Sequence, residues 1–263
     1  MSVDSIVTLT TDFGASSPYV AAMKGVILSI NPQVQVIDIT HAIPPQQIRP
    51  AAQVLADTTW LFPPRTIHLA VVDPGVGTSR AIVYAEIANQ QYICPDNGLL
   101  DRLAELHCPT KIIQVRESKY FRSRVTPTFH GRDIMAPVVG HLSLGLAPEL
   151  LGPPHATLVR LNWQKAEKMA NRIEGEVIEV DSFGNLITNI TRDMLNDVPT
   201  DETVAIRCEE HETRSIFQTY GDQPAMTLVA LIGSNDKLEI AIVDDSATIM
   251  LGVGVGAPVE VSW

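Results

Sequence analysis

A change in the spacing of apolar residues divides this chain of 263 residues into two parts. Up to about residue 165, short apolar runs alternate with amphipathic stretches, the pattern of βα units around a parallel sheet. From residue 172 onward, short alternating runs are separated by turn residues, which is typical of a small barrel. The polar stretch Asn162–Met169 lies between them. We therefore expect an α/β domain with a largely parallel sheet at 1–165, and a small all-β, barrel-like domain at 172–263.

The same periodicity predicts the individual elements. Pro18–Ile30 is expected to be a helix, because Ser16 or Ser17 can cap it and Asn31-Pro32 ends it. The other helices of the first domain are expected at Gln46–Leu61, Leu99–Leu106 and Asp133–Leu144. Its strands are expected at Ile6–Leu9, Val34–Ile39, Ile67–Val72, Ala81–Ile87, Tyr92–Cys94 and Lys111–Val115. The second domain is expected to have strands at Ile173–Val180, Leu186–Ile190, Val204–Cys208, Ser215–Tyr220, Leu228–Ile232, Leu238–Val243 and Pro258–Val261.

Composition excludes several classes of partner. With a formal net charge of −11 and no basic stripe, the chain lacks what binding to nucleic acid requires. No apolar run approaches the roughly 20 residues of a membrane span, and the amino-terminal stretch does not resemble a signal peptide. The three cysteines, Cys94, Cys108 and Cys208, form no C-x-x-C pair, so neither a disulfide framework nor a zinc site is expected. A reducing, cytoplasmic location fits best.

Three of the expected strands run directly into loops that combine an aspartate with glycine. These loops are Thr10–Gly14, Val71–Gly77 and Cys94–Gly98. One such loop is ordinary turn chemistry, but three at the carboxyl edge of a sheet indicate a ligand site. The loops match no phosphate-binding motif, and their aspartates would repel phosphate. Carboxylates at this edge suit a ribose diol or a cationic ligand.

Two further segments carry polar side chains suited to a site. Thr126–Asp133 leads into an expected helix and places His130 where it can face the same sheet edge, although a lone histidine is more often structural. In the second domain, Asp181–Asn189 has two readings. It can be a simple hairpin turn, or its aromatic and amide side chains can hold a small polar ligand.

Taken in order, these motifs resemble those of one enzyme family. They are Thr-Thr-Asp-Phe-Gly14, Val-Val-Asp-Pro-Gly-Val-Gly77 with Arg80 after it, Pro-Asp-Asn-Gly98, Thr-Phe-His-Gly-Arg-Asp133 and Asp-Ser-Phe-Gly-Asn185. The set is similar to the S-adenosylmethionine (SAM) hydroxide adenosyltransferases, which are relatives of the fluorinases and chlorinases. The resemblance spans nearly the whole chain. It implies an amino-terminal α/β domain, a carboxyl-terminal β barrel, no metal or cofactor, and a homotrimer that binds its small-molecule substrate between subunits.

The resemblance also implies roles for individual residues. Asp73, Arg80 and His130 would be the catalytic triad that handles water, and Asp12 would bind the ribose diol. In the second domain, Asp181 would hold the methionine ammonium, and Phe183 and Asn185 would contact adenine. Further substrate contacts would come from Phe13, Asp96, Asn97 and Ser234. The sequence departs from the family pattern at Asn235-Asp-Lys and Asp244-Asp245, where relatives often carry small residues, so the contacts of segment 233–247 stay open.

The implied reaction is hydrolysis of S-adenosyl-L-methionine to adenosine and L-methionine, by in-line attack of activated water or hydroxide at the ribose 5′ carbon. The sequence leaves open which member of the triad is the base. A halogenase is the alternative within the family, but a carboxylate beside the nucleophile would repel a halide. Two others are a metal-dependent hydrolase built on Asp12, Asp73, Asp96 and His130, and a nucleoside-binding regulator without chemistry.

Overall fold

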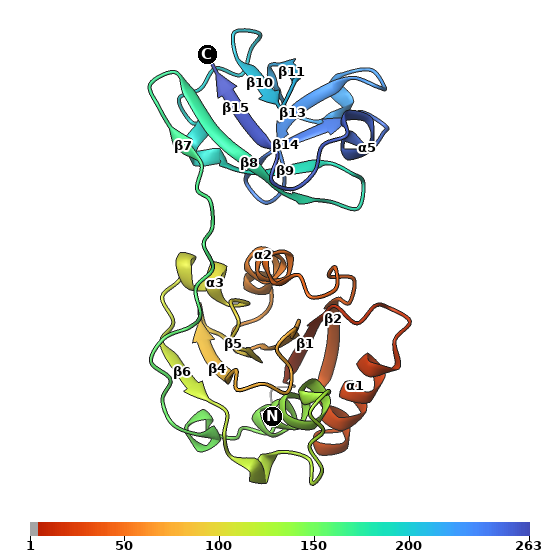
Figure 1. The fold of residues 1–263 in the computed structure, drawn as a ribbon, viewed down its shortest axis with the longest axis vertical. Coiled ribbons are helices and arrows are strands. Elements are labelled where there is room, and N and C mark those ends of the chain that lie inside the picture. Colours follow the sequence, from red (N-terminus) through yellow and green to blue (C-terminus); the bar gives the residue numbers. More distant parts are fainter. Residues whose placement is uncertain (1–4) are drawn as a thin grey trace. The chain divides into compact units, whose positions relative to one another are not determined.

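The computed structural model describes residues 5–263, which form two compact units, one ending at Leu161 and the other spanning Asn162–Trp263 (Figure 1). The division lies at the start of the polar stretch Asn162–Met169. Each unit encloses a hydrophobic core of its own. Within residues 5–263, every helix is too short or too polar to cross a membrane.

The first unit is built on a six-stranded sheet in the order β2-β1-β3-β5-β4-β6. Neighbouring strands β2, β1, β3 and β5 pair in parallel, so the chain leaves β1, β3 and β5 at the same edge. The strands are β1 (Ile6–Thr11), β2 (Gln35–Thr40), β3 (Ile67–Val71), β4 (Ile82–Ile87), β5 (Gln90–Pro95) and β6 (Lys111–Gln114).

The expectation of a largely parallel sheet is not confirmed, because this sheet is mixed. β4 is antiparallel to both of its neighbours, β5 and β6. The cause is the connection between β4 and β5, which consists of Ala88 and Asn89 with φ angles of 50° and 63°. A two-residue turn of this kind joins antiparallel strands, whereas a parallel pair needs a longer crossover.

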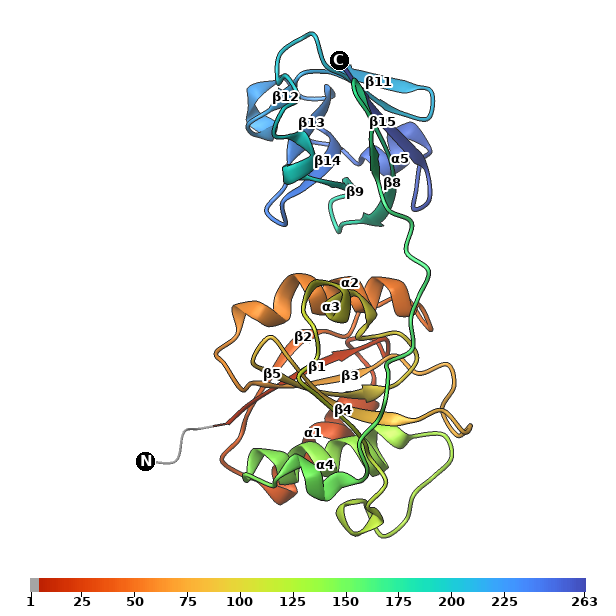
Figure 2. The same ribbon diagram turned by 90° about the vertical axis from the view of Figure 1, so that its left-hand side faces the viewer.

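Helices cover both faces of this sheet (Figure 2). On one face lie α1 (Pro18–Ile30) and α4 (Ala136–Ser143), and on the other lie α2 (Ile48–Thr58) and α3 (Asp101–Leu106). Successive residues of a strand pack into the cores on opposite faces of the sheet. In β4, for example, Tyr84 packs on the α1 side and Val83 on the α2 side. Short helical turns complete the unit at Thr59–Leu61, Ser118–Tyr120, Gly131–Met135 and Pro148–Leu151.

The second unit is a curved sheet in the order β11-β10-β15-β8-β9-β14-β13-β12, with β7 paired to β8. It curls until Oγ1 of Thr213 in β11 donates to the carbonyl of Leu228 in β13 at 2.7 Å, so the sheet is nearly barrel-shaped. The strands are β7 (Glu167–Lys168), β8 (Arg172–Val180), β9 (Leu186–Thr191), β10 (Ala205–Cys208), β11 (His211–Arg214), β12 (Ile216–Phe217), β13 (Leu228–Ile232), β14 (Lys237–Ile242) and β15 (Pro258–Ser262).

This unit also contains a short helix that the sequence reading did not predict, α5 (Ala247–Leu251). The side chain of Ser246 caps it by accepting from the amide of Ile249, and Gly252 ends it in the left-handed conformation. Short turns lie at Arg192–Leu195 and Tyr220–Asp222. The core is formed mainly by aliphatic residues of β8, β9, β10, β14 and β15.

The three cysteines are free thiols in different surroundings. Cys94 in β5 and Cys208 in β10 are buried, whereas Cys108 after α3 is exposed. Burial raises the pKa of the Cys94 thiol well above its usual range and that of Cys208 to about 11. The two buried thiols are therefore protonated at neutral pH.

Candidate active site

The aspartates that follow β1 and β3 lie at the shared carboxyl edge of the first sheet. Asp12 comes directly after β1, and its Oδ2 accepts a hydrogen bond from the amide of Gln46 at 2.8 Å. Asp73 follows β3 by two residues and is 5% exposed at its side chain. Because β1 and β3 are adjacent and parallel, both carboxylates open toward one region.

Arg80 joins Asp73 to His130. Its Nε donates to Oδ1 of Asp73 at 2.8 Å, and its Nη2 donates to Oδ2 of the same carboxylate. Nη2 also lies 3.1 Å from Nδ1 of His130. The guanidinium therefore holds the carboxylate with both oxygens and touches the imidazole at the same time, which only the fork geometry of arginine allows.

The contact with Arg80 determines how His130 carries its proton. A guanidinium can only donate, so Nδ1 of His130 accepts and the proton of the neutral ring sits on Nε2. Burial, followed by the positive charge of Arg80, lowers the pKa of His130 below its ordinary value, against the opposing effects of Asp73 and Asp133. At neutral pH the ring is neutral and its free nitrogen is a donor.

A cavity of about 400 Å³ opens over these residues. Its lining includes both aspartates and the imidazole described above, together with three aromatic rings, Phe13, Tyr19 and Phe129. The rings pack edge to face, with centroids 5.0 to 5.8 Å apart. One side of the cavity is thus polar and the other aromatic, which suits a small ligand with an apolar body and polar groups.

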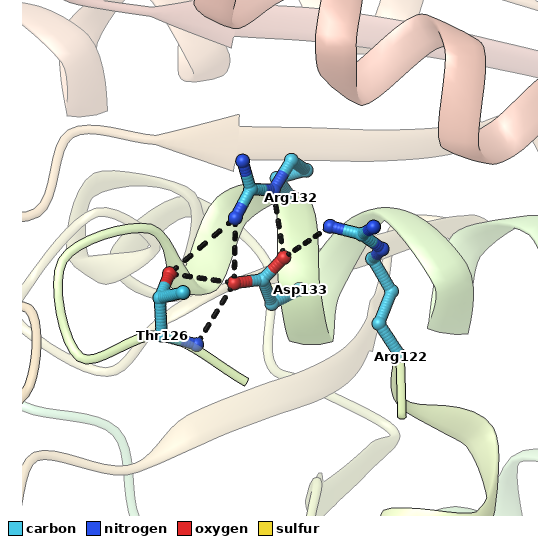
Figure 3. A network of polar contacts seen from close by, with 4 residues as sticks. All are labelled: Arg122, Thr126, Arg132 and Asp133. Carbon is cyan, nitrogen blue, oxygen red and sulfur yellow. Dashed lines mark hydrogen bonds and ion pairs between the residues drawn. The ribbon is translucent and has the colours of Figure 1, made fainter. Parts of the chain in front are cut away.

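The segment that carries Phe129 and His130 is held by Asp133, whose side chain is fully buried and is drawn with its hydrogen-bond partners in Figure 3. Arg122, Thr126 and Arg132 all donate to its carboxylate. Burial raises the pKa of Asp133, but the hydrogen bonds from Arg132, Thr126 and Arg122 outweigh it and hold that pKa well below its usual range. Asp133 is therefore an anion throughout the neutral range.

Asp96 and Asn97 also follow a strand of this edge, yet the structure directs their side chains elsewhere. Oδ2 of Asp96 is 2.9 Å from Nε2 of His155, and its Oδ1 accepts from the amide of Val159 at 2.8 Å. Asn97 donates to the carbonyl of Val72 at 2.9 Å. Among residues 5–263, those lining the 400 Å³ cavity do not include these two. Asp96 instead binds residues 155–159, in the chain segment that leads out of the first unit.

The second unit carries a cavity of its own, of about 560 Å³. The sequence-predicted Phe183 and Asn185 line it, and Phe183 is 77% exposed. Asp181 lies beneath this bend. Its Oδ1 accepts from the amides of Phe183 and Asn185 at 2.9 and 2.8 Å, and its Oδ2 accepts from Nδ2 of Asn185 at 2.9 Å. Ser234 is not among the described residues that line the cavity.

Sequence reasoning missed two members of this second cavity region. Tyr220 lines the cavity, and its hydroxyl donates to Oε1 of Glu239, which is 5% exposed. Burial raises the pKa of Glu239, as does the charge of Asp181, while the hydrogen bond from Tyr220 lowers it. The sequence signal that could have identified this pair is a glutamate within the apolar strand β14, because a buried carboxylate requires a hydrogen-bond partner.

The geometry also bears on metal binding. Within residues 5–263, no group of three or more histidine, cysteine, aspartate or glutamate side chains is placed so that it could hold a metal ion. Asp12, Asp73, Asp96 and His130 therefore do not converge as the metal-dependent alternative requires. Asp73 and His130 meet through Arg80, a cation.

Comparison with known proteins finds relatives along the whole chain. Residues 7–152 match the SAM hydroxide adenosyltransferase N-terminal domain, and residues 175–260 match the C-terminal domain of the same family. The (R)-S-adenosyl-L-methionine hydrolase of Thermus thermophilus is 38% identical over 95% of this chain and 96% of its own. The protein of that name from Methanocaldococcus jannaschii is 34% identical over 98% and 96%.

Two further similarities mark the breadth of the group. The fluorinase of Nocardia brasiliensis is 28% identical over 71% of each chain. A crystal structure of a conserved protein from Thermotoga maritima superposes with a TM-score of 0.93 at 37% identity, covering 98% of this chain and 100% of that one. Both family domains are matched in order, and relatives above 30% identity cover almost every residue. The chain belongs to the SAM hydroxide adenosyltransferase family.

Proposed function

We propose that this protein is an enzyme that hydrolyses S-adenosyl-L-methionine to adenosine and L-methionine. Relatives that are 34 to 38% identical over 95 to 98% of the chain carry the name (R)-S-adenosyl-L-methionine hydrolase. The observation in the structure that carries the proposal is the Asp73–Arg80–His130 contact beside the 400 Å³ cavity. It offers one acceptor, the carboxylate of Asp73, and one donor, the imidazole of His130, to a single water molecule.

The hydrogen bonds divide the catalytic roles among these three residues. His130 presents Nε2–H, so it donates to the oxygen of the attacking water and cannot accept its proton there. Arg80 fixes both partners and supplies the positive charge. Asp73 keeps unshared electron pairs on both oxygens beyond those that Arg80 uses, because a carboxylate has about four such positions. We therefore assign proton acceptance to Asp73.

A carboxylate is a weak base, but this reaction does not require free hydroxide, whose parent water has a pKa of about 15.7. As the water oxygen bonds to the 5′ carbon, it becomes positively charged and strongly acidic. One of its protons then moves to Asp73, and the other remains on the 5′ hydroxyl of adenosine. The carbon–sulfur bond breaks at the same time, and its electron pair stays on sulfur, giving neutral methionine. Holding water in line with that bond supplies much of the acceleration.

The other groups of the two cavities are proposed to bind the substrate. Asp12 would accept from the ribose hydroxyls, and Phe13 belongs to the aromatic wall beside it. In the second unit, Phe183 and Asn185 would contact adenine, and Asp181 would face the methionine ammonium. Asp96, Asn97 and Ser234 are also proposed to contact the substrate, although, like Asp181, they are not among the described residues that line either cavity.

We further propose a homotrimer in which each site combines the first unit of one subunit with the second unit of a neighbour. A cyclic assembly brings two different surfaces of the chain together at every interface, which suits a site made of two cavities. The three free cysteines fit a reducing compartment, and we place the protein in the cytoplasm. The proposed reaction uses no cofactor and no metal.

The test is to incubate the purified protein with SAM in water enriched in ¹⁸O, with a chelator present, and to separate the products. We expect adenosine and methionine in equal amounts, with the label at the 5′ oxygen of adenosine. The names of the relatives specify the (R) form, so the two sulfonium epimers should be assayed separately, and we expect faster turnover of (R). Label absent from adenosine would exclude direct attack, and loss of turnover with chelator would favour a metal-dependent hydrolase.

The fluorinase relatives justify one competing assay. Fluoride or chloride added to the same reaction should give no halogenated nucleoside, because the carboxylate of Asp73, beside the proposed position of the attacking water, would repel a halide. Tight binding of adenosine without any turnover of SAM would instead support a regulator that lacks chemistry.

A further inference from the structure

Asp133 lies outside the triad but holds the segment that carries His130. Its carboxylate accepts five hydrogen bonds, all from residues 122–132 (Figure 3). Oδ1 accepts from Nη1 of Arg122 at 2.8 Å and from Nε of Arg132 at 2.7 Å. Oδ2 accepts from the amide and the hydroxyl of Thr126 at 2.9 and 2.6 Å, and from Nη2 of Arg132 at 3.0 Å.

These bonds close a loop around His130. Thr126 precedes the histidine and Arg132 follows it, so Asp133 ties together the two sides of the bend on which the imidazole sits. Backbone bonds reinforce the closure: the amide of Asp133 donates to the carbonyl of Phe129 at 3.0 Å, and the amide of Arg122 donates to the carbonyl of Asp133 at 2.9 Å. The side chain therefore replaces the regular hydrogen bonding that this irregular segment lacks.

The segment that Asp133 holds, residues 122–132, also contacts the loop that carries Asp73 and Arg80. Gly77 in that loop has a φ of +79°, and a Cβ built on it would lie 2.4 Å from the carbonyl oxygen of Pro127. The two loops are thus in direct backbone contact next to Thr126, where Asp133 binds. A shift of residues 126–127 would change the separation of the loops, and with it the contact between Arg80 and His130.

We propose that Asp133 is a positioning residue of this site: by clamping residues 122–132 it holds the imidazole of His130 against the guanidinium of Arg80. The inference rests on the proposed hydrolysis for its effect on rate, although its geometric part can be measured without substrate. A buried carboxylate is suited to this task because bonds to charged donors are short and directional. Arg132 adds to it by placing its guanidinium 4.9 Å from the centre of the Phe129 ring, in the wall of the cavity.

The first test is Asp133→Asn, which keeps the shape of the side chain but replaces one carboxylate oxygen with an amide NH2 group. This group is a donor and would face the donors that the oxygen now binds. We expect kcat to fall by about 100-fold, since a displacement near 1 Å in a catalytic group has that effect. KM should change by less than about threefold, because Asp133 does not line the cavity. Asp101→Asn is the matched control. Asp101 is equally buried, but it holds Arg160 and Leu161, so its loss should lower stability and leave kcat near the wild-type value.

A second readout separates positioning from simple electrostatics. In the wild-type protein, burial and then the charge of Arg80 lower the pKa of His130, and the charges of Asp73 and Asp133 raise it. If Asp133→Asn releases His130 from Arg80, nitrogen NMR of labelled histidine will show this pKa rising toward its ordinary value. A further fall would mean that only the charge of Asp133 matters, and no change would mean that the clamp does not reach His130. Either of those results overturns the proposal, whether or not SAM proves to be the substrate.

The pair Thr126→Val and Thr126→Ser serves if Asp133→Asn does not fold. Valine removes the 2.6 Å bond from Oγ1 to Asp133 at nearly constant volume, whereas serine keeps the hydroxyl. We expect kcat to fall about tenfold in Thr126→Val and to recover in Thr126→Ser, with the pKa of His130 rising only in the valine variant. Equal kcat and equal titration in the two variants would refute the positioning role.

Discussion

His68 illustrates how the interior of the first unit controls the charge of a single side chain. It lies in β3 and is 1% exposed, with Nδ1 2.7 Å from Oγ1 of Thr8 and its ring stacked on Tyr92 at 5.0 Å. Burial lowers the pKa of His68 to about 3, although Gln90 acts in the opposite direction. A histidine in the unfolded chain titrates near 6.5. Between these two values the unfolded state binds a proton that the folded state does not.

Stability should therefore decrease as the pH falls from about 6.5 toward 3, with His68 contributing about 1.4 kcal/mol per pH unit over that range. The contribution is unfavourable only once the unfolded chain can protonate, so it is absent above about pH 6.5. His68→Gln should reduce the acid slope of the unfolding free energy measured in urea. His107→Gln, at an exposed histidine, is the control for the removal of a histidine as such. Equal slopes in the two variants would contradict the effect of burial.

A second prediction tests whether His130 acts as a hydrogen-bond donor or as the base that takes up the proton. His130→Gln retains an N–H group near the position of Nε2 but cannot take up a proton. We expect it to keep about a tenth of the wild-type kcat, whereas His130→Ala should lose a factor of about 10² to 10³. The comparison is made at neutral pH with saturating SAM. If both substitutions lower kcat equally, His130 acts as the base and Asp73 does not.

The triad and Asp96 show what the sequence can say about single residues. Asp73 and His130 could be picked out because each lies in a glycine-containing loop at a strand exit or helix start, whereas Arg80 was identified only through the family resemblance. The structure brings all three together. Their roles stay predictions. Asp96 has the same local signature as Asp73, yet its carboxylate binds His155, 59 residues along the chain. No local pattern distinguishes a carboxylate with a distant partner from one that faces a ligand.

Among the elements, the two loops that meet at Gly77 and Pro127 allow a sharp test of packing. Gly77→Ala adds a Cβ that would lie 2.4 Å from a carbonyl oxygen, at a φ of +79°. The loops must then separate, so we expect kcat to fall by about 100-fold. Gly145→Ala has a φ of +90° but no atom within 4 Å of the added Cβ. Both variants should lose about 1 kcal/mol of stability from the backbone strain, and only Gly77→Ala should lose activity.

The prediction of the elements succeeded where long periodic stretches decide the structure. The helix Pro18–Ile30 is observed with the expected bounds and the cap at Ser17. The mixed sheet was missed because the direction of β4 depends on two residues, Ala88 and Asn89, whose left-handed backbone is not evident from the apolar pattern. The helix α5 was missed because five residues are too few to show a helical period.

For the whole molecule, the central prediction is that one site uses two chains. Asp73→Ala should inactivate the first half of a site, and the double substitution Asp181→Ala with Asn185→Ala should inactivate the second half. Each variant by itself should be inactive. After dissociation and reassembly of an equal mixture, about a quarter of the sites should have two intact halves in a cyclic assembly. SAM turnover relative to the wild-type protein measures this fraction.

The outcome depends on true mixing of the chains. If each site lay within one chain, every site in the mixture would carry a lesion, and turnover would stay at zero. Failure of the subunits to exchange would produce the same result. Mixing must therefore be demonstrated on the same sample in which turnover is measured, and absence of turnover in demonstrably mixed assemblies would exclude a shared site.

The different surroundings of the three thiols give this chain a native attachment point for a spectroscopic reporter. Cys108 is exposed after α3, whereas Cys94 and Cys208 are buried and protonated. A maleimide dye should consequently react at one position per folded chain, because the thiolate is the reactive species. Donor-labelled and acceptor-labelled preparations could then report the exchange of chains by energy transfer. The wild-type sequence thus permits subunit mixing to be followed in real time without an engineered cysteine.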